Sequence, residues 1–125
     1  MAYRLTICFS AISNKMATST IKGGVESGTI SGALGHTIQW RKRNGIVELE
    51  ITNDTTRIPN GETLISTLPT DLKPKLVVHA DCYRVTQNQC SYIISPSTGK
   101  LSIYCEIATG SSSPYYLQAS IVYVL

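Results

Sequence analysis

The sequence has little charge and no long apolar run. Only 15% of its 125 residues are Asp, Glu, Lys or Arg, and 11 basic against 8 acidic residues give a formal net charge of +3. That excess is too small for a nucleic-acid footprint. No apolar stretch approaches the roughly 18 residues of a membrane span, and residues 1–9 do not have the pattern of a signal peptide. We therefore expect a soluble, unprocessed protein that neither binds nucleic acid nor inserts into a membrane.

Helical periodicity is nearly absent as well. No dozen residues carry apolar positions at three-to-four spacing without an intervening Gly, Pro or β-branched cluster. Apolar residues make up 42% of the chain, which excludes a disordered one. Alternation of period two recurs instead, beginning with Tyr3, Leu5, Ile7 and Phe9 on one face. These patterns predict one domain over residues 1–125, an all-β antiparallel β-sandwich of jelly-roll or Greek-key type with little or no helix.

Motifs of the common enzyme classes are missing. The sequence has no Gly-x-Ser-x-Gly, no His-Glu-x-x-His, no phosphate-binding loop and no dinucleotide-binding glycine pattern. Glu48 and Glu50 lie two residues apart on one expected strand face, as a pair of catalytic acids could. Their expected partners across the hairpin are Arg41 and Gln39, so we interpret both glutamates as members of surface pairs. Nucleophilic catalysis would need His36 or His79, and His79 has the pattern of a surface or interface histidine. We predict a protein that is not an enzyme and that has no cofactor.

A hairpin over residues 36–52 is the clearest local prediction. Asn44-Gly45 is a preferred pair for a two-residue type I′ turn, because both central residues need positive φ. The register that this turn sets places Trp40 opposite Leu49 on one face and polar pairs on the other. Turn chemistry and binary pattern therefore agree, and Trp40 is expected in the core.

The rest of the chain is divided by its turn signals. Residues 13–35 hold five glycines and predict a loop with one or two short strands. Residues 53–75 hold three prolines and predict a long connection with one short strand, which crosses between sheets or carries function. Residues 76–85 alternate and are expected to pair with 90–95. A four-residue turn at 96–99 then forms a second hairpin.

The four cysteines are Cys8, Cys82, Cys90 and Cys105, and no two of them form a Cys-x-x-Cys pair. We therefore expect no zinc site and no other metal site. The second hairpin places Cys90 opposite Cys105, which would permit a disulfide. Because no signal peptide is expected, reduced core thiols are the favoured interpretation.

The last strand is apolar on both faces. One face contains Leu117, Ala119, Ile121 and Tyr123. The other face contains Tyr116, Val122 and Val124. Such a strand should lie centrally in its sheet rather than at an open edge, and a monomer would leave its second face in water. We expect sister copies of the chain to cover this second face.

Three segments, taken in order, resemble a known family. They are residues 40–49 (WRKRNGIVEL), 68–75 (LPTDLKPK) and 98–103 (TGKLSI). A hairpin on a polar Asn/Gly turn, a Leu-Pro…Pro segment, a Gly-centred hairpin and a last strand follow one another as in the C-terminal head domains of bacteriophage tail-fibre and baseplate receptor-binding proteins. The resemblance covers about residues 36–125, the head core. Residues 1–35 match no such pattern and are expected to hold a neck-proximal strand and Gly-rich loops.

This resemblance implies a homotrimeric β-sandwich head that binds a host cell-surface saccharide or protein and catalyses nothing. It also implies a place at the tail tip of the virion, after synthesis in the cytoplasm of the bacterial host. Saccharide sites need aromatic faces and polar groups that bind hydroxyls. The candidate ligand residues in the loops are Tyr115, Tyr116, Asn53, Asp54, Arg57 and Asn60.

Two other functions remain open at this point. A structural decoration or shell protein could use a similar sandwich, and composition does not separate it from a receptor binder. A carbohydrate-binding module would present a planar row of exposed aromatics, which one Trp and seven Tyr at strand positions of mixed parity support only weakly. Binding to bacterial surfaces or to a glycan array would discriminate, because a decoration protein should bind neither.

Overall fold

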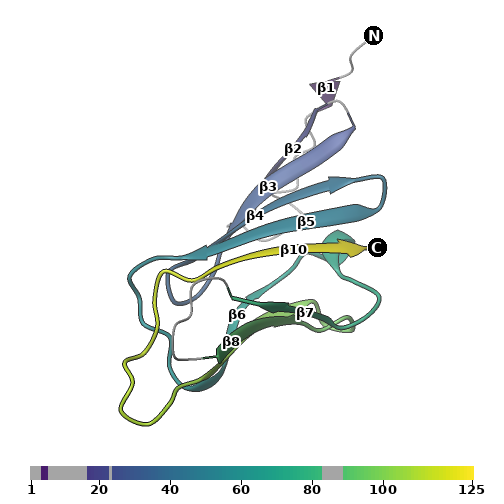
Figure 1. Cartoon of the computed structure of the whole chain (residues 1–125). Coiled ribbons are helices and arrows are strands. Elements are labelled where there is room, and N and C mark those ends of the chain that lie inside the picture. Colours follow the sequence, from purple (N-terminus) through teal and green to yellow (C-terminus); the bar gives the residue numbers. More distant parts are fainter. Residues whose placement is uncertain (1–3, 6–16, 23, 83–88) are drawn as a thin grey trace.

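The structure, a computed structural model, describes residues 4–5, 17–22, 24–82 and 89–125. Two antiparallel sheets pack face to face (Figure 1). The six-stranded sheet has the order β1 (Arg4–Leu5), β2 (Ala17–Lys22), β3 (Val25–Ser31), β4 (His36–Arg43), β5 (Ile46–Asn53) and β10 (Gln118–Val124). The four-stranded sheet has the order β6 (Gly61–Thr67), β9 (Lys100–Glu106), β8 (Gln89–Ile94) and β7 (Val78–Asp81). The expected all-β antiparallel sandwich is confirmed.

The hairpin of β4 and β5 has the predicted turn and register. Asn44 and Gly45 have φ of 51° and 74°, the left-handed values that a type I′ turn requires. Trp40 pairs with Leu49, as predicted, and both side chains are buried. Arg41 lies opposite Glu48 and forms an ion pair with it at 3.1 Å, so this glutamate is a surface pair partner as expected.

The glycine-rich first third is more regular than predicted. Instead of a loop with short strands, it forms β2 and β3, of six and seven residues, joined by a turn in which Gly24 has φ of 77°. Ser and Thr dominate these strands, so they lack the apolar alternation that reveals a strand in sequence. Backbone pairing holds β3 as a strand, because its residues Glu26–Ser31 form an antiparallel ladder with β4. Most of the predicted strand over residues 3–9 lies outside the described residues.

The long connection after β5 crosses to the second sheet, as predicted. It continues into β6, which has seven residues and a bulge between Leu64 and Ser66. A short 3-10 helix (η2, Thr70–Leu72) follows. β6 pairs with β9 rather than with β7, and β7, β8 and β9 are consecutive neighbours, which makes this sheet a Greek key.

Strand β7 is shorter than the predicted segment 76–85. It covers Val78–Asp81 and pairs with β8 as expected, with Val78 opposite Ile94. Leu76, the first residue of the predicted segment, lies outside the strand and is 78% exposed, so the predicted start of the strand is wrong. The residues at 83–85 lie outside the described part of the chain.

A disulfide joins Cys90 and Cys105, so the favoured interpretation of reduced thiols is wrong. The two residues are direct partners in the predicted register of β8 and β9, with Cα atoms 4.2 Å apart. Directly opposed cysteines at this separation can bond without moving the backbone. Reduced thiols were favoured from an expected cellular compartment, whereas the direct pairing of the two residues decides that the bond can form. Cys82 is a free, half-buried thiol.

Strand β10 lies at the edge of the six-stranded sheet, so the prediction of a central position is wrong. It pairs with β5 alone within the described residues. Its inner face is buried as predicted, from Leu117 to Tyr123. Its outer residues Val122 and Val124 are 64% and 68% exposed. Apolarity on both faces thus did not indicate neighbours on both edges.

The core lies between the sheets and consists of their inward-facing side chains together with apolar residues of the connecting segments. Ile38, Leu49, Tyr92, Ile103 and Leu117 are among the fully buried ones. Among the residues that the structure describes, no helix is long and apolar enough to cross a membrane. This rigid frame holds the loops that contain the predicted ligand residues.

Candidate functional site

Two loops far apart in the sequence lie together at one end of the sandwich. They are the β5–β6 connection (54–60) and the β9–β10 connection (107–117), and they lie at the end opposite the β4–β5 turn (Figure 1). Backbone hydrogen bonds join them: the Ile58 N–H donates to Pro114 O at 2.9 Å, and the Tyr116 N–H donates to Asp54 O at 3.1 Å. Most of the predicted ligand residues are therefore brought into one region, which we call the loop cluster: Asp54, Arg57, Tyr115 and Tyr116.

Asn53 lies beneath the loop cluster and not on its surface. Its side chain is 5% exposed, donates to Leu34 O at 3.1 Å and to Thr56 O at 2.8 Å, and accepts from the Leu117 N–H at 2.9 Å. A fully bonded, buried amide cannot face a ligand, so the prediction of Asn53 as a ligand residue is wrong. Its role is to fix both loops to the frame.

Asp54 is exposed at the rim of the loop cluster. Its Oδ1 accepts the Thr56 N–H at 2.8 Å, which makes a local Asx turn. Hydrogen bonds from the side chain and backbone of Thr56 hold the pKa of Asp54 below its ordinary value. The carboxylate is therefore ionised at neutral pH and partly committed to the loop.

Arg57, Tyr115 and Tyr116 form the exposed surface of the loop cluster. Arg57 Nη1 donates to Ser113 O at 2.6 Å, and its guanidinium carbon lies 4.7 Å from the centre of the Tyr115 ring. The rings of Tyr115 and Tyr116 are 5.3 Å apart and tilted by 49°. They are 42% and 53% exposed. Partly exposed aromatic rings in contact with one another, beside an arginine fixed by a hydrogen bond, are typical of recognition surfaces.

Asn60 lies at the start of β6, outside the loop cluster. Its Oδ1 accepts the Ile107 N–H at 2.9 Å and so joins the bases of the two connections. The Asn60 side chain is thus placed with the supporting contacts of the loops.

The predicted second apolar face does not form one surface. Tyr116 has φ of 56° and precedes β10, so it does not continue the alternation of that strand. Val122 and Val124 lie six or more residues further on, roughly 20 Å along an extended chain. They adjoin Ile46, which pairs with Val124 and is 45% exposed. We call Ile46, Val122 and Val124 the edge patch.

The two histidines occupy different settings. His36 is buried, and Ala33 O lies 2.7 Å from its Nδ1 and the Tyr92 hydroxyl 2.8 Å from its Nε2. Burial lowers the pKa of His36, so its ring is neutral at pH 7. Both ring nitrogens are occupied by hydrogen bonds within the fold. His79 is exposed on β7, as expected of a surface histidine.

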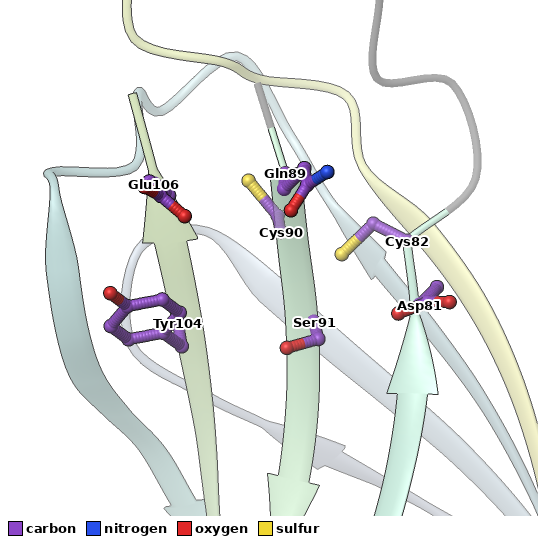
Figure 2. Close-up of a pocket in the computed structure, with 7 residues that line it drawn as sticks. All are labelled: Asp81, Cys82, Gln89, Cys90, Ser91, Tyr104 and Glu106. Carbon is purple, nitrogen blue, oxygen red and sulfur yellow. The ribbon is translucent and has the colours of Figure 1, made fainter. Parts of the chain in front are cut away.

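An open hollow of about 500 Å³ lies on β7, β8 and β9. Its lining residues are Asp81, Cys82, Gln89, Cys90, Ser91, Tyr104 and Glu106. Figure 2 shows Tyr104, Ser91 and Asp81 side by side on neighbouring strands, with the Cys82 sulfur directed toward the strand of Cys90. Burial raises the pKa of Cys82 to about 12, so the thiol is not a nucleophile at neutral pH. Among the described residues, no group of three or more His, Cys, Asp or Glu is arranged to hold a metal ion.

A second open hollow, of about 670 Å³, was missed by sequence reasoning. Its polar lining consists of Asp81 from β7 and of a strip on β4, β5 and β10: Gln39, Glu50, Thr52, Gln118 and Ser120. The Ser120 hydroxyl donates to Glu50 at 2.7 Å. Since Thr52 pairs with Gln118, two residues from Tyr116, this polar strip begins beside the loop cluster. Each side chain alternates outward in sequence, but only the pairing of β10 with β5 places them together.

Comparisons with protein-family models, curated proteins and solved structures found no match to this chain.

Proposed function

We propose that this domain is a non-catalytic receptor-binding head of the kind found at the tips of phage tail fibres and baseplates. In this proposal it binds a host cell-surface saccharide or protein through the loop cluster. The observation that carries the proposal is that Arg57, Tyr115 and Tyr116 come together from two different loops. The hydrogen bond between Arg57 and Ser113 joins residues that are 56 positions apart in the sequence.

The chemistry of the loop cluster suits recognition. Tyrosine offers an apolar ring and a polar hydroxyl with only two side-chain torsions to order, so binding costs little conformational entropy. The loops are held by buried Asn53 and by backbone hydrogen bonds, which limits their reorganisation on binding. The polar strip, which includes Gln118, Thr52, Ser120 and Glu50, extends this surface with groups that bind hydroxyls.

Association into a homotrimer is part of the same proposal, and the edge patch supports it. Val122 and Val124 are apolar, largely exposed, and lie on a strand whose second edge pairs with no strand of the described residues. Exposed edge strands with apolar side chains favour contact with another chain. A head at a tail tip would thereby display three loop clusters at once, which strengthens binding by avidity.

The direct test is adsorption of the purified protein to bacterial cells and to a glycan array. We expect Tyr115→Ala to reduce binding at least about tenfold without unfolding the domain, because hot-spot aromatics contribute about 2 kcal/mol or more. Tyr104→Ala is the matched control, since Tyr104 is 45% exposed on the other sheet. Loss of binding in the control and not in Tyr115→Ala would refute the loop cluster as the site.

The alternative function of a structural decoration protein would use the edge patch without the loop cluster. Light scattering on the isolated chain should give three times the 13.6 kDa mass of one chain, and Val122→Asp should lower it to one. A trimer that adsorbs to no cell and to no glycan would favour the decoration protein. A stable monomer would contradict the trimer in both functions.

A further inference from the structure

The side chain of Arg57 is held in place although it is exposed. Its Nη1 donates to Ser113 O at 2.6 Å and its guanidinium carbon lies 4.7 Å above the Tyr115 ring. Two such contacts fix the plane of the guanidinium, so less rotamer entropy is lost when a further group binds. The remaining N–H groups keep the fork geometry that matches the two oxygens of a carboxylate or phosphate.

This arginine has no acidic partner in the described part of the chain. The ion pairs found there join Arg41 to Glu48 and Lys42 to Asp71. Asp54, the acid nearest to Arg57 in its own loop, accepts hydrogen bonds from Thr56 instead. A positioned positive charge that has no ion-pair partner among the described residues therefore lies beside the exposed tyrosines.

The tyrosines supply the second half of a binding surface. Tyr116 is 53% exposed, and its ring lies 5.3 Å from that of Tyr115. Its backbone N–H donates to Asp54 O, which holds the residue at φ of 56°. The C–H face of a sugar ring can stack on such an aromatic while a charged substituent reaches the guanidinium.

We propose that the loop cluster selects glycans whose sugars or linkages carry an anionic group, a carboxylate or a phosphate, and that Arg57 determines this selection. The inference rests on the proposed function and names the ligand class. The hollow of Figure 2 is the less suitable place for such a ligand, because Asp81 and Glu106 line it and no arginine or lysine is among its lining residues.

A different basic region serves as an internal control. Arg43 lies with Arg41 at the opposite end of the sandwich, where the two line an open hollow of about 280 Å³. Arg43 is exposed and, in the described part of the chain, takes part in no ion pair. Arg43→Gln removes the same charge as Arg57→Gln and leaves the loop cluster intact.

The experiment is titration calorimetry of the full chain with three probes: an oligogalacturonate, its methyl ester and a short poly(glycerol phosphate). The ester keeps the sugar rings and removes the charge. We expect the acid or the phosphate polymer to bind roughly tenfold or more tightly than the ester, since a bidentate charged contact contributes at least 1.4 kcal/mol. Arg57→Gln should reduce that preference to within about threefold, and Arg43→Gln should leave it unchanged.

The outcomes separate this inference from the function on which it rests. Equal binding of acid and ester, or loss of the preference in Arg43→Gln only, overturns the selection by Arg57. If the ester binds as tightly as the acid and Tyr115→Ala weakens binding of the ester, the proposed receptor-binding function is supported and the selection of anionic glycans is refuted. Failure of all three probes up to millimolar concentration also overturns the anionic class, and cell adsorption of Tyr115→Ala then decides the proposed function separately. Circular dichroism of each variant excludes unfolding as the cause.

Discussion

The hydrogen bond between the buried Tyr92 and His36 gives the sharpest stability prediction. Tyr92 is 0% exposed, and its hydroxyl lies 2.8 Å from His36 Nε2. Because His36 Nδ1 lies 2.7 Å from Ala33 O, the proton of the neutral ring belongs on Nδ1. Nε2 is then the acceptor and the Tyr92 hydroxyl the donor, in a contact that joins the two sheets.

Tyr92→Phe removes the donor and keeps the ring. The ring centres of Tyr92 and His36 are 5.6 Å apart in an edge-to-face arrangement, so packing changes little. The buried acceptor left without a partner costs about 1–3 kcal/mol of unfolding free energy. A loss of about 2 kcal/mol corresponds to a fall of roughly 8 °C in Tm for a domain of this length.

Urea unfolding at pH 8, with the Cys90–Cys105 disulfide intact, measures this loss. Tyr104→Phe is the matched control, because the Tyr104 side chain is 45% exposed and should cost less than about 0.5 kcal/mol. A loss in Tyr92→Phe no larger than in the control would refute the assignment of the buried donor and acceptor.

Three further predictions concern single groups. Burial holds the pKa of His36 below its ordinary 6.5, so the unfolded state binds the extra proton as pH falls. The unfolding free energy should therefore be constant only well above pH 6.5, should begin to decrease as the pH approaches 6.5, and should decrease below it by up to about 1.4 kcal/mol per pH unit; a flat urea profile from pH 8 to 5 would contradict this. With the pKa of Cys82 at about 12, iodoacetamide at pH 8 should label it about a thousandfold more slowly in the native protein than in urea, while peptide mapping without reductant recovers Cys90 linked to Cys105. Gly45→Ala should cost about 1 kcal/mol in urea unfolding through backbone strain alone, since φ is 74° and an added Cβ meets nothing within 4 Å; an unchanged midpoint would argue against the type I′ turn.

The candidate site was partly predictable from sequence. Loop position and residue type were enough to select Arg57, Tyr115 and Tyr116, and the structure brings them together. The same reasoning wrongly selected Asn53, because a buried amide that supports a loop has the same sequence pattern as an exposed one that binds a ligand. The polar strip at Gln118 was missed, since its partners belong to a strand that is more than 60 residues away.

Local sequence determined the two hairpins of this protein. Asn44-Gly45 and Pro96–Gly99 set their own turns, and alternation on either side sets the register, so Trp40 against Leu49 and Cys90 against Cys105 follow from adjacent residues. Tertiary structure alone decided that β10 closes the edge of the larger sheet and that the loops after β5 and β9 meet. Those arrangements depend on which distant strands pair across the whole fold, and a strand that is apolar on both faces carries no information about how many neighbours it has along its edges.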